Sequence, residues 1–391
     1  MGSRRVVPLA FVGLLACAQV CPSAKAKQII VDDDKAECPT ATFTSIQAAV
    51  NAASPGDQII VCKGVYVEQV EVHKSLAIDG ASGAILMPSP IVANSTSLFD
   101  GSPLAVALLV SNTTDVTIDG LIVDGGNSGI TGCAPDLLGI AFQNASGAIQ
   151  RVTVRNFKLA PGLNGCQSGT GIFVQSGGGQ TSNVAIGNSS IHDYQKNGIT
   201  ADEIGTEVAV RFNVVTGLGS TNGAAQNGIQ IGFGAQGAIH QNTVTHHIWA
   251  GCTEASTCTA VATDVLVVQS DGVSVTDNMA GVSQVPIFIA GNLARVSGNR
   301  AFSALIFDPI RLEGSQNTTK NNVIFSGVES GIFIDGNDNV VTGNTITEAG
   351  VGILKTSTST GNVIHSNSIF DSPVKVQDPA VRIASLLSPK R

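Results

Sequence analysis

Three side chains in the C-terminal part of the chain combine one cation with two carboxylates: Arg311, Glu313 and Asp335. Arg311 and Glu313 are two positions apart, the spacing that places side chains on one face of a β-strand. Asp335 follows Glu313 by 22 positions, which matches the period of a repeat described below. Two carboxylates held close together shift each other's pKa values and can then act as an acid and a base.

Such a cluster suits two kinds of sugar chemistry. Paired carboxylates cleave glycosidic bonds. A lyase or epimerase instead needs a base beside a cation that neutralises a uronate, and Arg311 would supply that cation. The alternative is an ion pair on the protein surface, in which Arg311 bridges Glu313 or Asp335 without a catalytic role.

A second group of polar and aromatic side chains includes those in the segments 192–197 and 246–252. An indole ring suits stacking on a sugar, and the chain has one tryptophan. We therefore predict a substrate-binding wall, with a hydrophobic plug that secures a long loop as the competing interpretation. Its members are Asp202, Gln230, Tyr194, His246, His247 and Trp249.

The sequence predicts no resident metal or cofactor. Two adjacent histidines, His246 and His247, provide too few ligands, because a site needs three or four that converge. The chain has three Met and no tract rich in Met and His, which gives a copper role little support. Calcium held by Asp202 and Glu203 is the remaining alternative.

These candidates take their positions from a repeat. Asparagines recur at 278, 299, 322, 344 and 367, in steps of 21, 23, 22 and 23. Each unit holds three short runs rich in Val, Ile and Thr, separated by Gly, Asn and Asp. No unit offers ten residues of helical periodicity. The repeat therefore predicts an all-β solenoid, a single-stranded parallel β-helix of about eleven rungs stacked ~4.8 Å apart.

The recurring asparagines are predicted to be structural. A bend between two strands favours a left-handed backbone, which Asn tolerates better than other non-glycine residues. Asparagines stacked at one corner can also pass amide hydrogen bonds from rung to rung. We extend the same slot back to Asn242, Asn213, Asn188 and Asn156.

The repeat also aligns the first strand of each rung. The inward positions are predicted to be Ile140, Ile172, Ile199, Ile229, Val265, Ile287, Ile310, Ile332 and Ile353. Their outward neighbours are Phe173, Thr200, Gln230, Leu266, Phe288, Arg311, Phe333 and Leu354. The apolar members of the second set suggest a covered or adhesive face rather than a hydrated cleft.

Both ends of the solenoid are predicted to be capped. Residues 44–53 form the best helix in the chain, with Thr44 and Gln47 as a capping box. At the other end, the segment from Pro373 breaks the repeat and is predicted to cover the last rung. We assign 27–57 to the N-terminal cap, 58–370 to the β-helix and 371–391 to a C-terminal cap or tail.

The segment FTSIQAAVNAASPGDQIIVCKGVYVEQVEV (43–72), with Gly64, Tyr66 and Glu68 in a G-x-Y-x-E phrase, resembles the pectin lyase-like superfamily. That resemblance implies a right-handed parallel β-helix over about 30–391, with a saccharide groove floored by the first strands. The phrase FDPI (307–310) is similar to an Asp-Pro-His-Asp phrase of alginate epimerases, but Ile310 and Arg311 replace its last two residues.

Six cysteines remain beyond the N-terminal segment, and an even number in an exported chain suggests disulfides. Six allow 15 pairings. The aligned repeat narrows these to Cys38 with Cys62, Cys133 with Cys166, and Cys252 with Cys258.

The N-terminus is predicted to be a signal peptide, cleaved near Ala26. Arg4 and Arg5 precede an apolar stretch too short to span a bilayer, and Ala24-Lys25-Ala26 gives an A-x-A site. A lipoprotein signal ending at Cys17 and a twin-arginine signal at Ser3-Arg4-Arg5 are the alternatives. The chain is then secreted or periplasmic, and no other stretch is apolar and long enough for a membrane span.

Charge restricts the partners. The net charge is −8, and cleavage after Ala26 makes it −11, which disfavours nucleic acid and anionic membranes. We predict a polysaccharide partner, bound or acted on by a lyase, hydrolase or epimerase along the first-strand groove. The alternative is a non-catalytic structural or carbohydrate-binding solenoid. The oligomeric state is not determined by the sequence.

Overall fold

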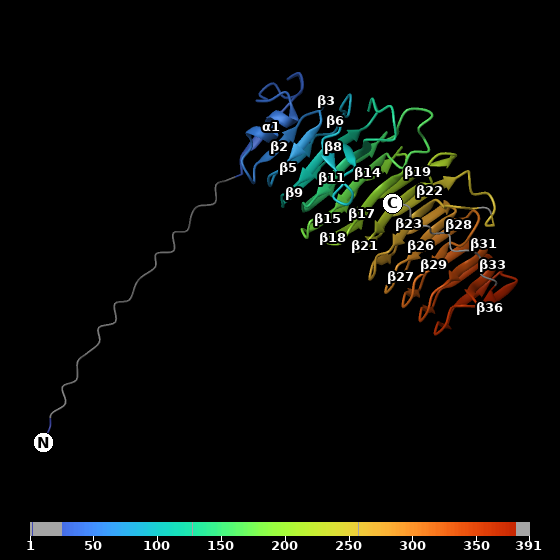
Figure 1. Cartoon of the computed structure of the whole chain (residues 1–391). Coiled ribbons are helices and arrows are strands. Elements are labelled where there is room, and N and C mark those ends of the chain that lie inside the picture. Colours follow the sequence, from blue (N-terminus) through green and yellow to red (C-terminus); the bar gives the residue numbers. More distant parts are fainter. Residues whose placement is uncertain (1, 3–25, 127, 257, 381–391) are drawn as a thin grey trace.

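The short runs of Val, Ile and Thr form strands that stack in parallel along one axis. The computed structural model describes residues 2, 26–126, 128–256 and 258–380. These form the predicted right-handed parallel β-helix, whose strands follow one another along the coil (Figure 1). The predicted signal peptide lies almost entirely outside the described residues, as do residues 381–391.

Three ladders of strands make the three sides of the coil. The second strand of every rung lies in one 13-stranded sheet, which exceeds the eleven rungs expected. Its strands are β1 (Gln28–Val31), β2 (Gln58–Val61), β5 (Ala77–Gly80), β9 (Val116–Asp119), β12 (Gly147–Gln150), β15 (Ser182–Gly187), β18 (Thr206–Arg211), β21 (Gln236–His240), β24 (Ser274–Thr276), β27 (Arg295–Ser297), β30 (Thr318–Lys320), β32 (Val340–Thr342) and β34 (Val363–His365).

The other two sides belong to one 23-stranded sheet, because two long strands run through both: β31 (Val323–Ile334) and β33 (Thr345–Thr356). The remaining strands of the third-strand side are β3 (Gly64–Tyr66), β6 (Ala84–Leu86), β10 (Ile122–Asp124), β13 (Thr153–Arg155), β16 (Ser190–His192), β19 (Val214–Thr221), β22 (Thr243–Trp249), β25 (Met279–Ser283), β28 (Arg300–Ala304) and β35 (Ser368–Phe370).

The first-strand face carries the candidate sites. Its remaining strands are β4 (Val70–Val72), β8 (Pro103–Ser111), β11 (Asp136–Gln143), β14 (Thr170–Gln175), β17 (Asn197–Asp202), β20 (Asn227–Gly232), β23 (Thr263–Val268), β26 (Val285–Ala290), β29 (Ile310–Leu312) and β36 (Val374–Ala380). A short strand, β7 (Ser95–Thr96), pairs antiparallel with β8.

The register of this face is the one predicted. From Ile140 to Ile353 the nine inward residues pair in sequence, and all are fully buried. The strand β36 pairs in parallel with β33, so within the described residues it continues the ladder instead of covering its end.

The asparagine ladder exists, with one correction to its geometry. Six consecutive side-chain amides donate to the next asparagine at 2.9–3.0 Å, from Asn213 to Asn367. The left-handed backbone belongs to the residue before each asparagine, for example Asp277 at φ 55° and Gly298 at φ 70°. In the preceding rung the ladder position belongs to Ser189 and not to Asn188. Asn188 itself has the left-handed backbone, with φ 53°, and Ser189 donates its N–H to Asn213.

One helix, α1 (Ile46–Ala52), covers the N-terminal end (Figure 1). Its N-cap is Ser45, not Thr44, and the Ser45 side chain accepts from the N–H of Ala48. Glu68, the last residue of the G-x-Y-x-E phrase, accepts from the Ser45 hydroxyl and from the N–H groups of Ile46 and Gln47. This motif residue therefore fixes the start of the helix.

Candidate functional site

Arg311 is the centre of the first predicted cluster and is completely buried. In register it lies between Phe288 of β26 and Phe333 of β31. Its guanidinium carbon is 3.8 Å from the centre of the Phe333 ring. Nε bonds to Glu313 Oε1 at 2.8 Å, and Nη1 bonds to Asp308 Oδ2 at 2.9 Å. The ion pair is thus internal, unlike the solvated pair considered above.

The two predicted carboxylates occupy neighbouring rungs, as expected. Leu312 pairs with Ile334, and Glu313 and Asp335 immediately follow β29 and β31. Asp335 Oδ1 accepts a hydrogen bond from the Thr356 hydroxyl at 2.7 Å. Arg311 bonds to Glu313, as predicted, and also to Asp308, which the sequence did not identify.

Two acidic residues outside the predicted site complete this cluster. Asp308 is fully buried, and its Oδ1 accepts from the N–H and the hydroxyl of Ser330 at 3.0 and 2.6 Å. Burial raises the pKa of Asp308, while Arg311 opposes that rise. Burial, followed by the nearby Asp308 charge, raises the pKa of Glu329 to about 7. Asp308 lies two positions before β29, and Glu329 lies within β31, just before the part that pairs with β29. Their acidic side chains in the phrases FDPI and VESG are the signal that could have identified them.

Two polar atoms of this cluster are buried without a hydrogen-bond partner among the described residues: Arg311 Nη2 and Glu329 Oε2. A carboxyl group protonated near neutral pH is suited to general acid catalysis. The cluster therefore offers Glu329 as an acid and the ion-paired Glu313 as a second carboxylate. We refer to Asp308, Arg311, Glu313 and Glu329 as the arginine cluster.

The apolar stripe beside the arginine cluster is covered. Leu266 and Phe288 pack with Cys252, Val261 and Phe307, and Trp249 lies against this group. Gln284 fastens the covering loop, because its amide bonds to the backbone N–H and carbonyl of Trp249. The sequence allowed Trp249 to be part of a substrate-binding wall or of a hydrophobic plug that secures a long loop. This environment matches the plug.

The structure does not bring the predicted substrate wall together. Tyr194 and His247 are buried inside the coil, whereas the neighbouring His246 is exposed. The Tyr194 hydroxyl contacts His247 Nε2, and His247 Nδ1 is 2.6 Å from Asp264 Oδ1. Burial lowers the pKa of His247 to about 3 and raises that of Asp264. This internal triad is closed to solvent, so Tyr194 and His247 cannot line a ligand site here.

Asp202 and Gln230 do lie together on the outward side of the first-strand face. Gln230 Nε2 is 3.4 Å from Asp202 Oδ1, and Gln230 Oε1 accepts from Asn197 and Asn227 at 3.3 and 3.2 Å. Thr263 extends this chain of bonds to Asn227 at 2.8 Å. A row of amides and hydroxyls thus crosses β17, β20 and β23.

A cavity of about 880 Å³ opens in the loops that precede the first strands. Amides and hydroxyls line it together with apolar groups, and Lys158 is its one charged lining residue. Lys158 lies 3.4 Å from Asp193. The polar lining residues are Ser128, Thr131, Asn156, Lys158, Asn164, Gln195 and Thr221.

One disulfide fixes the loops around this cavity. Cys133 and Cys166 pair, and they follow the lining residues 128–131 and the lining segment 156–164. Gln195 holds the second segment, because its amide donates to the carbonyls of Leu163 and Cys166 at 2.8 and 3.0 Å. The other predicted pairs also form, Cys38 with Cys62 and Cys252 with Cys258.

Comparison with solved structures shows the same fold. A GH136 lacto-N-biosidase from Eubacterium ramulus superposes with a TM-score of 0.59 and 12% identity, over 88% of this chain and 68% of that chain. DFA-IIIase from Arthrobacter chlorophenolicus A6, in complex with DFA-III, gives 0.50 and 16% identity, over 89% and 86%. No curated protein matches the sequence. In the described part of the chain, no helix has the length and apolarity that crossing a membrane requires.

One sequence family matches, described as "Periplasmic copper-binding protein (NosD)", over residues 182–386. The described residues do not fit a copper centre. Their one group of three converging His, Cys, Asp or Glu side chains lies outside the match and offers only carboxylates, Asp32, Asp34 and Glu37. Copper prefers imidazole and sulfur ligands, whereas all six described cysteines are in disulfides and His247 is sealed in the core. The family match spans more than half of the sequence, and the chain therefore belongs to the NosD family.

Proposed function

We propose that this protein binds an oligosaccharide or a polysaccharide chain outside the cytoplasm, on the first-strand side of the coil. The cavity of about 880 Å³ carries this proposal. Its volume lies in the range of small-molecule sites, and its amides and hydroxyls can pair with sugar hydroxyls. The row of polar groups around Asp202 and Gln230 extends the same face along β17 and β20.

The charge of the site favours a neutral or weakly acidic glycan. Lys158 is the single charged lining residue, and Asp193 lies within ion-pair distance of it. The net charge of −8 also opposes a strongly anionic ligand. The structural neighbours support a carbohydrate ligand, since one is a lacto-N-biosidase and the other contains bound DFA-III.

Export is part of the proposal. Three disulfides fit an oxidising compartment. The matching family is described as periplasmic. The sequence of the first 26 residues has the features of a cleaved signal peptide.

A glycan-binding screen of the mature protein, followed by calorimetry on the best ligand, tests the proposal. Ala160 is exposed and lines the cavity, so Ala160→Trp fills it without disturbing the core. We expect Ala160→Trp to weaken binding at least about tenfold, a loss of ~1.4 kcal/mol. Ala81→Trp, at an exposed position outside the cavity, is the matched control. Unchanged affinity of Ala160→Trp, or no glycan bound, contradicts the proposal.

Hydrolysis of a glycosidic bond is a second candidate function, favoured by one observation. Glu329 has a pKa raised to about 7 by burial and by Asp308, and it lies near Arg311, which is bonded to a second carboxylate, Glu313. An acid and an ionised carboxylate in different environments form the pair that glycoside hydrolysis requires.

New reducing ends, measured on a panel of neutral and acidic polysaccharides, test this second function. Glu329→Gln and Glu313→Gln should abolish turnover while glycan binding is kept. Glu348→Gln, at an exposed position on β33 one rung further on, should leave turnover unchanged. If no polysaccharide gave new reducing ends, hydrolysis would be contradicted and glycan binding would be the only proposed function.

A further inference from the structure

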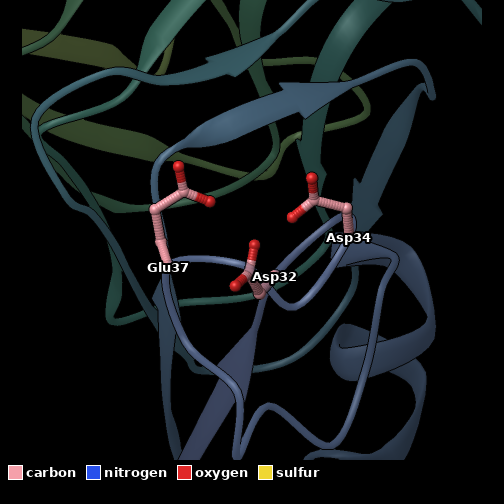
Figure 2. A group of neighbouring side chains, drawn as sticks. All are labelled: Asp32, Asp34 and Glu37. Carbon is pink, nitrogen blue, oxygen red and sulfur yellow. The ribbon is translucent and has the colours of Figure 1, made fainter.

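Three carboxylates converge in the loop that follows β1. Asp32, Asp34 and Glu37 come from the sequence DDDKAEC, and one carboxylate oxygen from each lies within 4.8 Å of the others. Figure 2 shows the three side chains directed toward a common space. Calcium binds oxygen at 2.3–2.6 Å, so ligand oxygens on opposite sides of one ion are ~5 Å apart. The spacing is therefore that of ligands around a single cation.

Asp32 gives an independent sign of a ligand. Its side chain is completely buried, and its Oδ1 has no hydrogen-bond partner among the described residues. The other oxygen, Oδ2, accepts from the N–H of Cys38 at 2.5 Å. A buried carboxylate oxygen without a partner is costly. A cation in the space between the three carboxylates would satisfy it.

The loop is held in shape on both sides. Cys38 is bonded to Cys62, which follows β2. Asp33 turns away from the group, because its Oδ2 accepts from the N–H of Val65 in β3 at 2.9 Å. Between the ligands, Lys35 adopts φ 64°. A disulfide and a neighbouring strand thus pre-organise the three carboxylates.

The negative charge of this group is not balanced by an ion pair. None of the ion pairs formed by the described residues involves Asp32, Asp34 or Glu37. Tyr66 lies beside the loop and donates its hydroxyl to the carbonyls of Cys62 and Val31 at 2.9 and 3.2 Å. Burial raises the pKa of Tyr66, and the charges of Asp33 and Asp32 raise it further.

We propose that Asp32, Asp34 and Glu37 bind a calcium ion. Three carboxylates and no imidazole or thiolate make a hard oxygen site, which suits calcium and not copper. This site is separate from Asp202 and Glu203, the calcium ligands considered from the sequence. The ion ties the loop after β1 to the disulfide beside β2, and so it stabilises the N-terminal end of the coil.

Titration of the chelator-treated mature protein with CaCl₂ by calorimetry tests the site, with Tb³⁺ luminescence as a second readout. The chain has two tyrosines and one tryptophan. Tyr66 is adjacent to the loop, so excitation of the protein should sensitise bound Tb³⁺. Asp34→Asn and Glu37→Gln remove one charge each at positions that are not buried, and the fold should survive both. Glu207→Gln, exposed on β18, is the charge-matched control.

We expect one Ca²⁺ per chain and an apparent melting temperature that rises with Ca²⁺ concentration, because the ion binds only the folded state. Asp34→Asn and Glu37→Gln should each weaken binding about tenfold or more, as the loss of metal-site partners commonly does. Glu207→Gln should bind like the parent protein. The proposal is overturned if the parent protein binds no Ca²⁺, or if both loop variants bind it unchanged.

Discussion

At the scale of single residues, the strand face of the arginine cluster was predictable from the sequence, but its burial was not. The spacing of Arg311 and Glu313 predicted a shared strand face, and the two side chains are bonded. Their burial was not predictable, since it depends on the loop after β22, which packs against Phe288, and on Phe307 just before β29. Asp308 and Glu329 were missed for the same reason, because their importance comes from desolvation and not from spacing.

Arg311→Leu should destabilise the fold by about 3–5 kcal/mol, because it leaves Asp308 buried without its cation. Urea denaturation at pH 7 measures the change. Arg295→Leu, at an exposed position on β27, should alter stability by no more than about 0.5 kcal/mol. Adding Asp308→Asn to Arg311→Leu should restore part of the loss. Equal stability of Arg311→Leu and the parent protein would show that the buried pair contributes nothing.

Glu329 should make stability depend on pH. Its pKa is raised from 4.5 to about 7 in the folded protein, so folding favours the protonated form. The stability of the parent protein should therefore fall as pH rises from 4.5 to 7. Glu329→Gln removes this loss, so it should match the parent at pH 4.5 and be roughly 1–2 kcal/mol more stable at pH 8. Denaturation curves at pH 4.5 and pH 8 measure both proteins. The same stability difference between Glu329→Gln and the parent protein at the two pH values would contradict the prediction.

At the scale of elements, the corner of each rung was predicted well in composition and less well in geometry. The repeat of asparagines predicted a hydrogen-bonded ladder, and the structure contains it from Asn213 to Asn367. The sequence did not show which corner residue takes the left-handed backbone, because Asn, Asp, Gly and Ser all tolerate it. The helix start was displaced by one residue for a similar reason, since Glu68 caps it from a distant strand.

Asn322→Ala should cost about 2–3 kcal/mol, because it leaves buried partners on both neighbouring rungs unsatisfied. Asn322 accepts from the side chain and N–H of Asn299 and donates to Asn344 and to the carbonyl of Val296. Chemical denaturation measures the change. Asn183→Ala, on the exposed face of β15, is the control and should be close to neutral. If both variants had a similarly small effect, the asparagine ladder would not contribute measurably to the free energy of unfolding.

At the scale of the whole molecule, the fold was the most predictable property. A period near 22 residues is visible in the sequence, and each unit carries the same three runs, so the stacking of rungs follows from the repeat alone. The cavity and the covered stripe interrupt that period. They are built by the long insertions after β10, β13 and β22, whose conformations no repeat specifies.

The N-terminal helix should keep the molecule from associating end to end, because an uncovered strand ladder offers free edges. Ile46, the first residue of α1, is fully buried, so Ile46→Lys should detach the helix. We expect dimers or larger species that increase with concentration in light scattering. Asn51→Lys, on the exposed side of the same helix, should remain like the parent protein. Identical scattering of the two variants would show that the helix has no such role.

From Asn278 to Asn367 each rung bonds to the next through the same asparagine contact, at steps of 21 to 23 residues. Duplication of the gene segment that encodes one rung would insert one more rung into the coil. The contacts made by the rungs on either side would stay the same. The molecule would lengthen by ~4.8 Å for each added copy, while the cavity and the acidic loop near the other end would be untouched. This C-terminal part of the protein can thus vary in length independently of its ligand sites.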